Sequence, residues 1–141
     1  MTLRFLLDTS IISRAQGPLP DHAVAERLAA VGEEAAIASI ALHELLYGVA
    51  ILPAGRKRRN LERFIDTAVR SAFTILPYDE AAATWHAGER ARLKAAGQTA
   101  SFIDGQIAAV AAVNGLIVVT ANVRHFRNFE GLSVEDWSTP R

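Results

Sequence analysis

The chain has 141 residues, 50% of them apolar, and its 15 Lys and Arg residues balance 15 Asp and Glu residues. This composition fits a single domain over residues 1–141 and excludes a nucleic-acid binder that works by bulk positive charge. The absence of Cys excludes disulfides, thiolate zinc sites and thiol catalysis. No signal peptide and no run of about 18 apolar residues is present, so we expect a cytoplasmic protein without membrane association.

The first third of the chain alternates short apolar runs with helical patterns. Residues 4–7 contain the continuous apolar run Phe5-Leu6-Leu7 and are predicted to form a strand buried on both faces; a short helix is expected over residues 10–17. The next helix is predicted over residues 21–32, where an Asp caps the start and a Gly ends it. Residues 35–38 read as a second strand. A helix over residues 39–52 should be capped by its first residue, a Ser.

The rest of the chain continues the alternation. A helix with a strongly basic start is predicted over residues 53–73, a long helix capped by an Asp over 79–97, and a helix capped by a Ser over 101–114. Short apolar strands separated by helices predict an α/β fold, a three-layer α/β/α sandwich with a central parallel sheet of four to five strands. The remaining strands are expected at residues 74–76, 116–119 and 132–134.

Polar side chains follow two of these strands, where open α/β sheets place their ligand sites. Asp8 comes directly after the first strand, and Thr120 and Asn122 follow the strand at 116–119. Glu44 and Asp104 lie in helices and have mostly apolar or small neighbours three and four positions away, with no Lys or Arg among them. A carboxylate on such a face is costly to bury unless it is paired, hydrogen-bonded or bound to a metal. Oxygen ligands of this kind indicate Mg²⁺ or Mn²⁺.

Structural roles are the alternative for some of these acids. Asp8 is also placed to cap the first short helix, and Asp104 follows Ser101 at the spacing of a capping box. Glu44 lies too far inside its helix to cap it. The glutamates expected to lie on solvated surface are Glu33, Glu34, Glu89, Glu130 and Glu135.

Five stretches stand in order along nearly the whole chain: FLLDTSIIS, SIALHELLYGV with GRKRRNLE after it, LPYDEAAA, SFIDGQIAAVA and VVTANVRHF. In these stretches the chain resembles the PIN-domain ribonucleases and, within them, the VapC-type toxins of bacterial toxin–antitoxin pairs. The resemblance implies a PIN-like sandwich that hydrolyses single-stranded or looped RNA with Mg²⁺ or Mn²⁺. The metal ligands it implies are Asp8, Glu44, Asp104 and Asn122. Many family members have Asp where this chain has Asn122, so we expect one bound ion in the absence of RNA.

The resemblance also suggests further roles. Asp104 is the candidate proton acceptor for the attacking water, and Thr120 and Asn122 would orient ligands. A small antitoxin is the expected protein partner, and a homodimer the expected assembly. Because the site is acidic, RNA binding needs a basic surface elsewhere, and the basic run that begins at residue 56 is the main candidate. The alternative explanation for this run is a helix start exposed to solvent. The candidate RNA-binding residues are Arg56, Lys57, Arg58, Arg59, Arg124 and Arg14.

Two rival functions remain. A catalytically inactive PIN-like module that binds RNA or protein would have no need for the three carboxylates. A phosphate-accepting receiver or phosphatase would use Asp8, but the chain has neither a second acid beside Asp8 nor a suitably placed Lys after a later strand.

Overall fold

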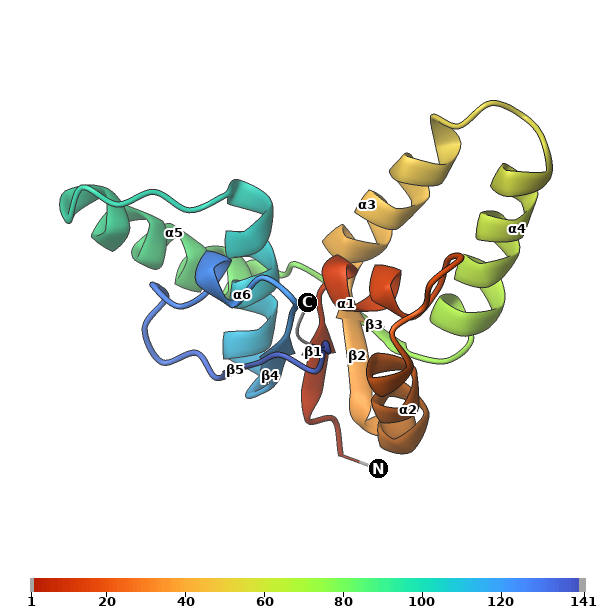
Figure 1. The fold of residues 1–141 in the computed structure, drawn as a ribbon. Helices are drawn as coiled ribbons and strands as arrows, with labels where there is room; N and C mark the ends of the chain where they lie inside the picture. Colours follow the sequence, from red (N-terminus) through yellow and green to blue (C-terminus); the bar gives the residue numbers. More distant parts are fainter. Residues whose placement is uncertain (1, 140–141) are drawn as a thin grey trace.

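A computed structural model describes residues 2–139 and contains a five-stranded sheet in which every neighbouring pair of strands is parallel (Figure 1). The strand order is β3-β2-β1-β4-β5. The predicted three-layer α/β/α architecture is confirmed, and the fifth strand lies two residues later than expected at its start. The strands are β1 (Phe5–Leu7), β2 (Ala35–Ala38), β3 (Thr74–Leu76), β4 (Ile117–Val119) and β5 (Val134–Glu135).

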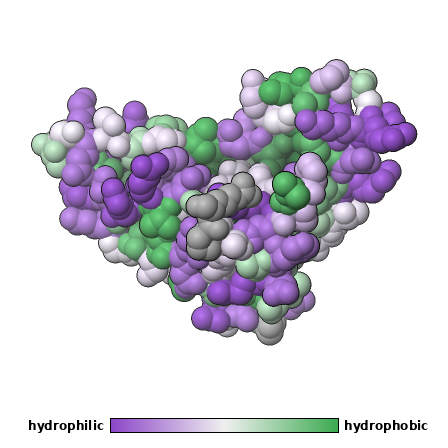
Figure 2. All heavy atoms as spheres, viewed as in Figure 1, coloured by the Kyte–Doolittle hydropathy of each residue, from purple (hydrophilic) through white to green (hydrophobic). Residues whose placement is uncertain are grey.

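The helices lie on both sides of the sheet. Figure 1 shows α5 and α6 on one side of the strands and α2 and α4 on the other. Figure 2, in the same view, shows a surface that is notched between the α3–α4 arm and the α5–α6 arm. No helix within residues 2–139 is long and apolar enough to cross a membrane. The α-helices are α1 (Thr9–Arg14), α2 (His22–Val31), α3 (Ser39–Ala50), α4 (Arg56–Phe64), α5 (Glu80–Ala95) and α6 (Phe102–Asn114); η1 (Gly32–Glu34) and η3 (Val123–His125) are 3₁₀ turns, and η2 (Ile65–Arg70) is a π-helical segment.

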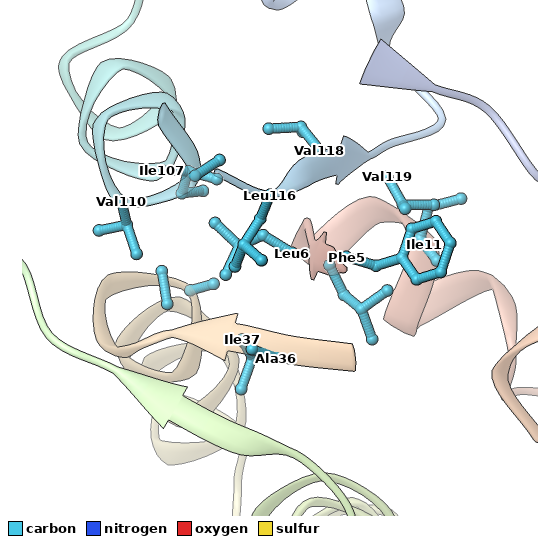
Figure 3. Close-up of a cluster of buried hydrophobic side chains, with 14 of the residues drawn as sticks. Phe5, Leu6, Ile11, Ala36, Ile37, Ile107, Val110, Leu116, Val118 and Val119 are labelled. Carbon is cyan, nitrogen blue, oxygen red and sulfur yellow. The ribbon is translucent and has the colours of Figure 1, made fainter. Parts of the chain in front are cut away.

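The core is centred on β1, whose three residues are all buried because the strand has neighbours on both sides. Phe5 pairs in register with Ala35 of β2 and with Ile117 of β4. Strand β2 is mostly Ala, a residue that is depleted in strands, and forms here because it is fully enclosed between β1 and β3. Figure 3 shows apolar side chains from these strands, from α1 and from α6 converging on this core.

Most of the expected helix caps are present. The carboxylates of Asp21 and Asp79 accept hydrogen bonds from backbone N–H groups of α2 and α5, and Ser101 Oγ accepts one from Asp104 N. The prediction for Ser39 was wrong. Ala38 occupies the capping position in an extended conformation, and Ser39 is the first residue of α3.

The helix predicted over residues 53–73 consists of two segments. After α4, the chain continues into η2 with a wider helical turn. In this region Thr67 Oγ1 donates to the carbonyl of Arg63 and Ser71 Oγ to that of Asp66, at 2.8 Å each. Hydroxyls that bond back to the helix in this way compete with its regular hydrogen bonds.

Glu89 does not lie on solvated surface, contrary to expectation. Its side chain is 13% exposed and binds the Arg92 guanidinium through both oxygens, at 2.8 and 2.9 Å. It also accepts a hydrogen bond from Glu130 N, and Arg92 donates to the Asn128 carbonyl. Hydrogen bonding by Arg92 lowers the pKa of Glu89 more than burial raises it. The pair therefore fastens α5 to the loop that follows η3.

Helices α5 and α6 pack closely at one glycine. A Cβ atom on Gly105 would overlap His86 Nε2 and would lie 2.8 Å from Cδ2. His86 is buried, and its Nδ1 atom is hydrogen-bonded to the Tyr78 hydroxyl at 3.0 Å. Because Gly105 directly follows Asp104, this contact also fixes the position of the Asp104 backbone relative to α5.

Candidate active site

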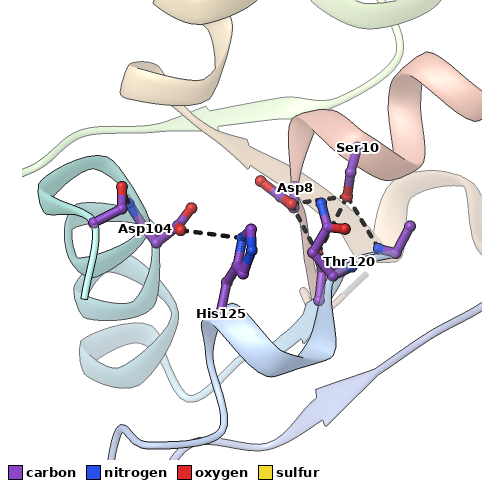
Figure 4. Close-up of polar contacts among 8 residues, drawn as sticks. Asp8, Ser10, Asp104, Thr120 and His125 are labelled. Atoms are coloured by element: carbon purple, nitrogen blue, oxygen red, sulfur yellow. Dashed lines mark hydrogen bonds and ion pairs between the residues drawn. The ribbon is translucent and has the colours of Figure 1, made fainter. Parts of the chain in front are cut away.

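Asp8 lies at the carboxyl end of β1 and is buried. It occupies the capping position of α1, yet its side chain makes no capping hydrogen bond. Its Oδ2 atom instead accepts hydrogen bonds from Ser10 Oγ and Thr120 Oγ1, both at 2.8 Å (Figure 4). The helix-capping alternative for Asp8 was therefore wrong, and the side chain is directed into the predicted site.

The two hydroxyls are themselves oriented by the backbone of the β4–η3 loop. Ser10 Oγ accepts from Ala121 N at 3.0 Å, and Thr120 Oγ1 accepts from Asn122 N at 2.9 Å. Because each hydroxyl has only one proton, these contacts leave that proton for Asp8. The Oδ1 atom of Asp8 has no hydrogen-bond partner within residues 2–139 and remains available to a ligand.

Asp104 lies in the first turn of α6, opposite Asp8. Its backbone N–H makes the expected capping bond with Ser101, but its side chain faces the site, with Oδ2 3.5 Å from His125 Nδ1 (Figure 4). Burial raises the pKa of the Asp104 carboxyl, and the charge of Asp8 raises it further; His125 and Ser101 act in the opposite direction. The structure thus places Asp8 and Asp104 at one edge of the sheet, close enough for the charge of Asp8 to affect the ionisation of Asp104.

His125 is a neighbour of the site that sequence reasoning missed. Its side chain is about half exposed and comes from η3, at the end of the stretch TANVRH. The contact with Asp104 depends on how η3 packs beside α6, which no periodicity in the sequence reports. The only indication in the sequence that His125 belongs near the site was its place three positions after Asn122, a predicted site residue.

Glu44 projects from α3 and is half-buried. It lines a groove of about 340 Å³ together with Thr9 and Ser13 of α1, the helix that directly follows Asp8. Within residues 2–139, no three side chains of Asp, Glu, His or Cys are already grouped closely enough to hold a metal ion. The metal site formed by Asp8, Glu44 and Asp104 therefore stays a prediction.

The donor chemistry of the site nevertheless fits a hard divalent ion. The groups at this edge are carboxylate, hydroxyl and amide oxygens. Burial raises the pKa of Asp104 most, and the negative charge of Asp8 adds to that rise, so the two carboxylates repel each other. Mg²⁺ commonly uses only one or two carboxylates, and completes its coordination with water and substrate phosphate. Two coupled carboxylates with a free oxygen on Asp8 meet that requirement.

The remaining predicted site residues are distributed around this edge. Asn122 is exposed at the start of η3, and Arg124 is exposed within it. Arg14, at the end of α1, has a buried Nη1 atom without a hydrogen-bond partner in the described part of the chain. Their roles in metal or RNA binding stay predictions.

The basic run lies farther away, at the start of α4, the outer helix of the α3–α4 arm (Figure 1). Arg58 is half-buried and is held by Glu62 at 2.8 Å and by the Leu52 carbonyl at 3.2 Å. This arginine therefore secures the α3–α4 connection. Arg56, Lys57 and Arg59 are exposed, and the RNA-binding role of all four residues of the run, Arg58 included, stays a prediction.

Comparison with known proteins identifies relatives over nearly the whole chain. Residues 5–132 match the PIN domain family model. The chain is 39% identical over 140 residues to the tRNA(fMet)-specific endonuclease VapC of Shigella flexneri, covering 96% of this chain and 99% of the relative. It is 34% identical over 124 residues to Toxin FitB of Neisseria gonorrhoeae, covering 86% and 89%.

Solved structures agree with the sequence relatives. The structure of FitAB bound to the IR36 DNA fragment superposes with a TM-score of 0.86 at 30% identity, covering 97% of this chain and 98% of that one. DNA-bound VapBC from Salmonella typhimurium superposes with a TM-score of 0.84 at 31% identity, covering 96% and 99%. With the fold, the carboxylates at the sheet edge and these matches in agreement, the chain belongs to the PIN domain family, in the group that includes the VapC and FitB toxins.

Proposed function

We propose that this protein is a Mg²⁺- or Mn²⁺-dependent endoribonuclease, the toxin of a toxin–antitoxin pair, and that residues 1–141 act as one PIN domain. The observation that carries the proposal is the arrangement around Asp8. One of its oxygens is held by two oriented hydroxyls, the other is free, and a second carboxylate is coupled to it across the sheet edge.

Each residue then has a defined task. Asp8, Glu44, Asp104 and the amide oxygen of Asn122 would hold the ion, directly or through water. When bound there, the ion would supply positive charge for the scissile phosphate and would make a bound water molecule easier to deprotonate. Burial, and after it the charge of Asp8, raise the pKa of the Asp104 carboxyl in the metal-free protein. Asp104 is the proposed acceptor for the proton of the attacking water. Thr120 keeps Asp8 in position.

The relatives suggest the substrate and the partners. Two of them are named as tRNA(fMet)-specific endonucleases, which favours a structured RNA as the substrate. Cleavage of such an RNA would take place in the cytoplasm. Solved relatives are toxin–antitoxin complexes, which favours a cognate antitoxin. A homodimer is proposed from the family resemblance.

The test is cleavage of a pool of structured RNAs by the purified chain, with Mg²⁺, with Mn²⁺ or with EDTA. We expect cleavage only with a metal, and its loss in Asp8→Asn. Asp66→Asn is the matched control, because Asp66 is an exposed aspartate of η2 in a surface ion pair with Arg70. Metal binding, followed by calorimetry, should weaken in the first variant and stay unchanged in the second. RNA that is bound but never cut under any metal condition would favour the inactive binding module.

A further inference from the structure

Beside the active site, the α5–α6 arm has a cavity whose lining is both polar and apolar. A cavity of about 610 Å³ lies between α5 and the loop that leads into α6, and its lining includes His86, Arg90, Lys94, Ser101 and Phe129. Ser101 Oγ accepts a hydrogen bond from Asp104 N, so the cavity ends one helical turn from the carboxylates. None of the functions assigned above uses this cavity.

The charge of this cavity is positive. Arg90 and Lys94 lie four positions apart on α5, on the same face of the helix, and neither forms an ion pair with a carboxylate within residues 2–139. Burial lowers the pKa of His86, and the charge of Arg90 lowers it further, so the imidazole adds no charge at neutral pH. These two cations give the cavity a charge opposite to that of the acidic active site beside it.

An exposed aromatic ring stands beside these cations. Phe102, the first residue of α6, is 49% exposed and lies two positions before Asp104. The Arg90 guanidinium lies over its ring, 4.8 Å from the centroid, and the His86 ring is 5.0 Å away at 53°. An aromatic ring backed by an arginine is the arrangement on which bases of single-stranded nucleic acids stack.

We propose that Phe102, Arg90 and Lys94, together with the cavity beside them, form a subsite that holds one nucleotide of single-stranded RNA next to the bond that is cut. This inference rests on the proposed ribonuclease function. The base stacks on the Phe102–Arg90 pair, and the flanking phosphates contact Arg90 and Lys94. Figure 2 shows mainly hydrophilic surface over this arm, which suits a charged strand better than an apolar helix of a protein partner.

The subsite also completes a path for the substrate. Arg56, Lys57 and Arg59 lie on the α3–α4 arm, and the new subsite lies on the α5–α6 arm. Between the two arms Figure 1 shows β1, whose carboxyl end Asp8 directly follows. A strand that contacts both arms would cross the carboxylates. Each arm alone would hold the RNA on one side of the cut only.

The test measures binding of a fluorescently labelled single-stranded oligoribonucleotide to the full chain by anisotropy, in EDTA so that no cutting occurs, over a range of salt concentrations. In Arg90→Gln/Lys94→Gln we expect Kd to rise at least about tenfold at low salt, and the slope of log K against log salt to fall by about 1.4, since each phosphate contact with single strands contributes about 0.7. In Phe102→Ala we expect about a tenfold rise in Kd with an unchanged slope, because stacking is lost and no charge is removed.

The control is Arg4→Gln/Arg70→Gln, which removes two exposed arginines from surface ion pairs outside the active site and should leave Kd unchanged. Thermal melting checks that each variant is folded. If Phe102→Ala proves unstable, the comparison of Arg90→Gln/Lys94→Gln with its control, Arg4→Gln/Arg70→Gln, carries the test. An unaltered slope in Arg90→Gln/Lys94→Gln, in a protein whose wild type cuts RNA, would overturn the subsite and leave the nuclease proposal intact. If these variants weaken RNA binding but the wild type never cuts RNA, the surface binds RNA without being a subsite of a nuclease, and both proposals are overturned in that form. Variants that lose the antitoxin but keep RNA would make the surface a protein interface and overturn the inference.

Discussion

Replacing Gly105 with Ala should destabilise the protein, although the same change in most helices stabilises it. The replacement of a helical Gly by Ala normally contributes about 1 kcal/mol of stability. At Gly105 the new methyl group would overlap the His86 ring. Overpacking of this kind costs about 1–3 kcal/mol, and displacing the ring would weaken the hydrogen bond to the Tyr78 hydroxyl by about 1 kcal/mol. The net loss is about 1–3 kcal/mol, or a fall in melting temperature of about 4–12 °C.

Gly88→Ala is the matched control. Gly88 lies in α5, two residues after His86, and a Cβ atom there meets nothing within 4 Å. This variant should therefore gain about 1 kcal/mol, with a rise of about 4 °C. Urea and thermal melts of the two variants, followed by circular dichroism, would give changes of opposite sign.

The double variant His86→Ala/Gly105→Ala identifies the cause. Without the imidazole, the methyl group has room, so the penalty of the glycine change should largely disappear in this background. RNA cleavage should fall in Gly105→Ala, because α6 is pushed away from α5 and takes Asp104 with it, and it should be unchanged in Gly88→Ala. If both glycine variants were stabilised equally, close packing of α6 on the His86 ring would be refuted.

Three other changes have definite expected outcomes. Asp104→Asn should raise the free energy of unfolding of the metal-free protein at pH 7, because a carboxyl whose pKa is raised on folding opposes the fold when it is ionised. Urea melts should show that this gain shrinks as the pH falls through the raised pKa and is gone below the ordinary pKa of 3.8. Asp21→Asn should lower stability at neutral pH, since hydrogen bonds from Thr139 lower the pKa of Asp21, and the same melts should show the deficit vanishing as the pH falls from 3.8 through that lowered pKa. Thr120→Val removes one of the two hydroxyl donors to Asp8 and should reduce the cleavage rate about 10–100-fold, whereas Thr120→Ser should cleave at nearly the wild-type rate. Equal rates in the two Thr120 variants would mean that the hydroxyl has no part in the reaction.

The position of the site could be predicted because two local signals coincide with a rule of the fold. Asp8 and Thr120 each directly follow an apolar run, and the carboxyl ends of neighbouring parallel strands meet at one edge of the sheet. The caps at Asp21, Asp79 and Ser101 were predictable for a similar reason, since each depends on residues two or three positions away.

Features that depend on distant segments were not predictable. The ion pair of Glu89 with Arg92 joins residues three positions apart, but such a pair also occurs on exposed helix surfaces and does not indicate burial. The hydrogen bond from Glu130 N to Glu89 spans 41 positions, and no local pattern indicates it. The contact of His125 with Asp104 likewise exists only once η3 packs beside α6. The side chain of Asp8 was ambiguous between a cap and a site residue, because the choice depends on whether Thr120 is there to donate a hydrogen bond.

The hydrogen bond between Asp8 and Thr120 joins residues 112 positions apart. At about 5–20 residues per second, a ribosome takes roughly 6–20 s to travel from one codon to the other. During that time the nascent chain carries Asp8 without the strand that orients it, although β2 is already available to pair with β1. A prematurely terminated chain that ends before β4 would share this defect. Under the proposed function, the order of synthesis therefore places the completion of the active site near the end of translation, after most of the chain has been made.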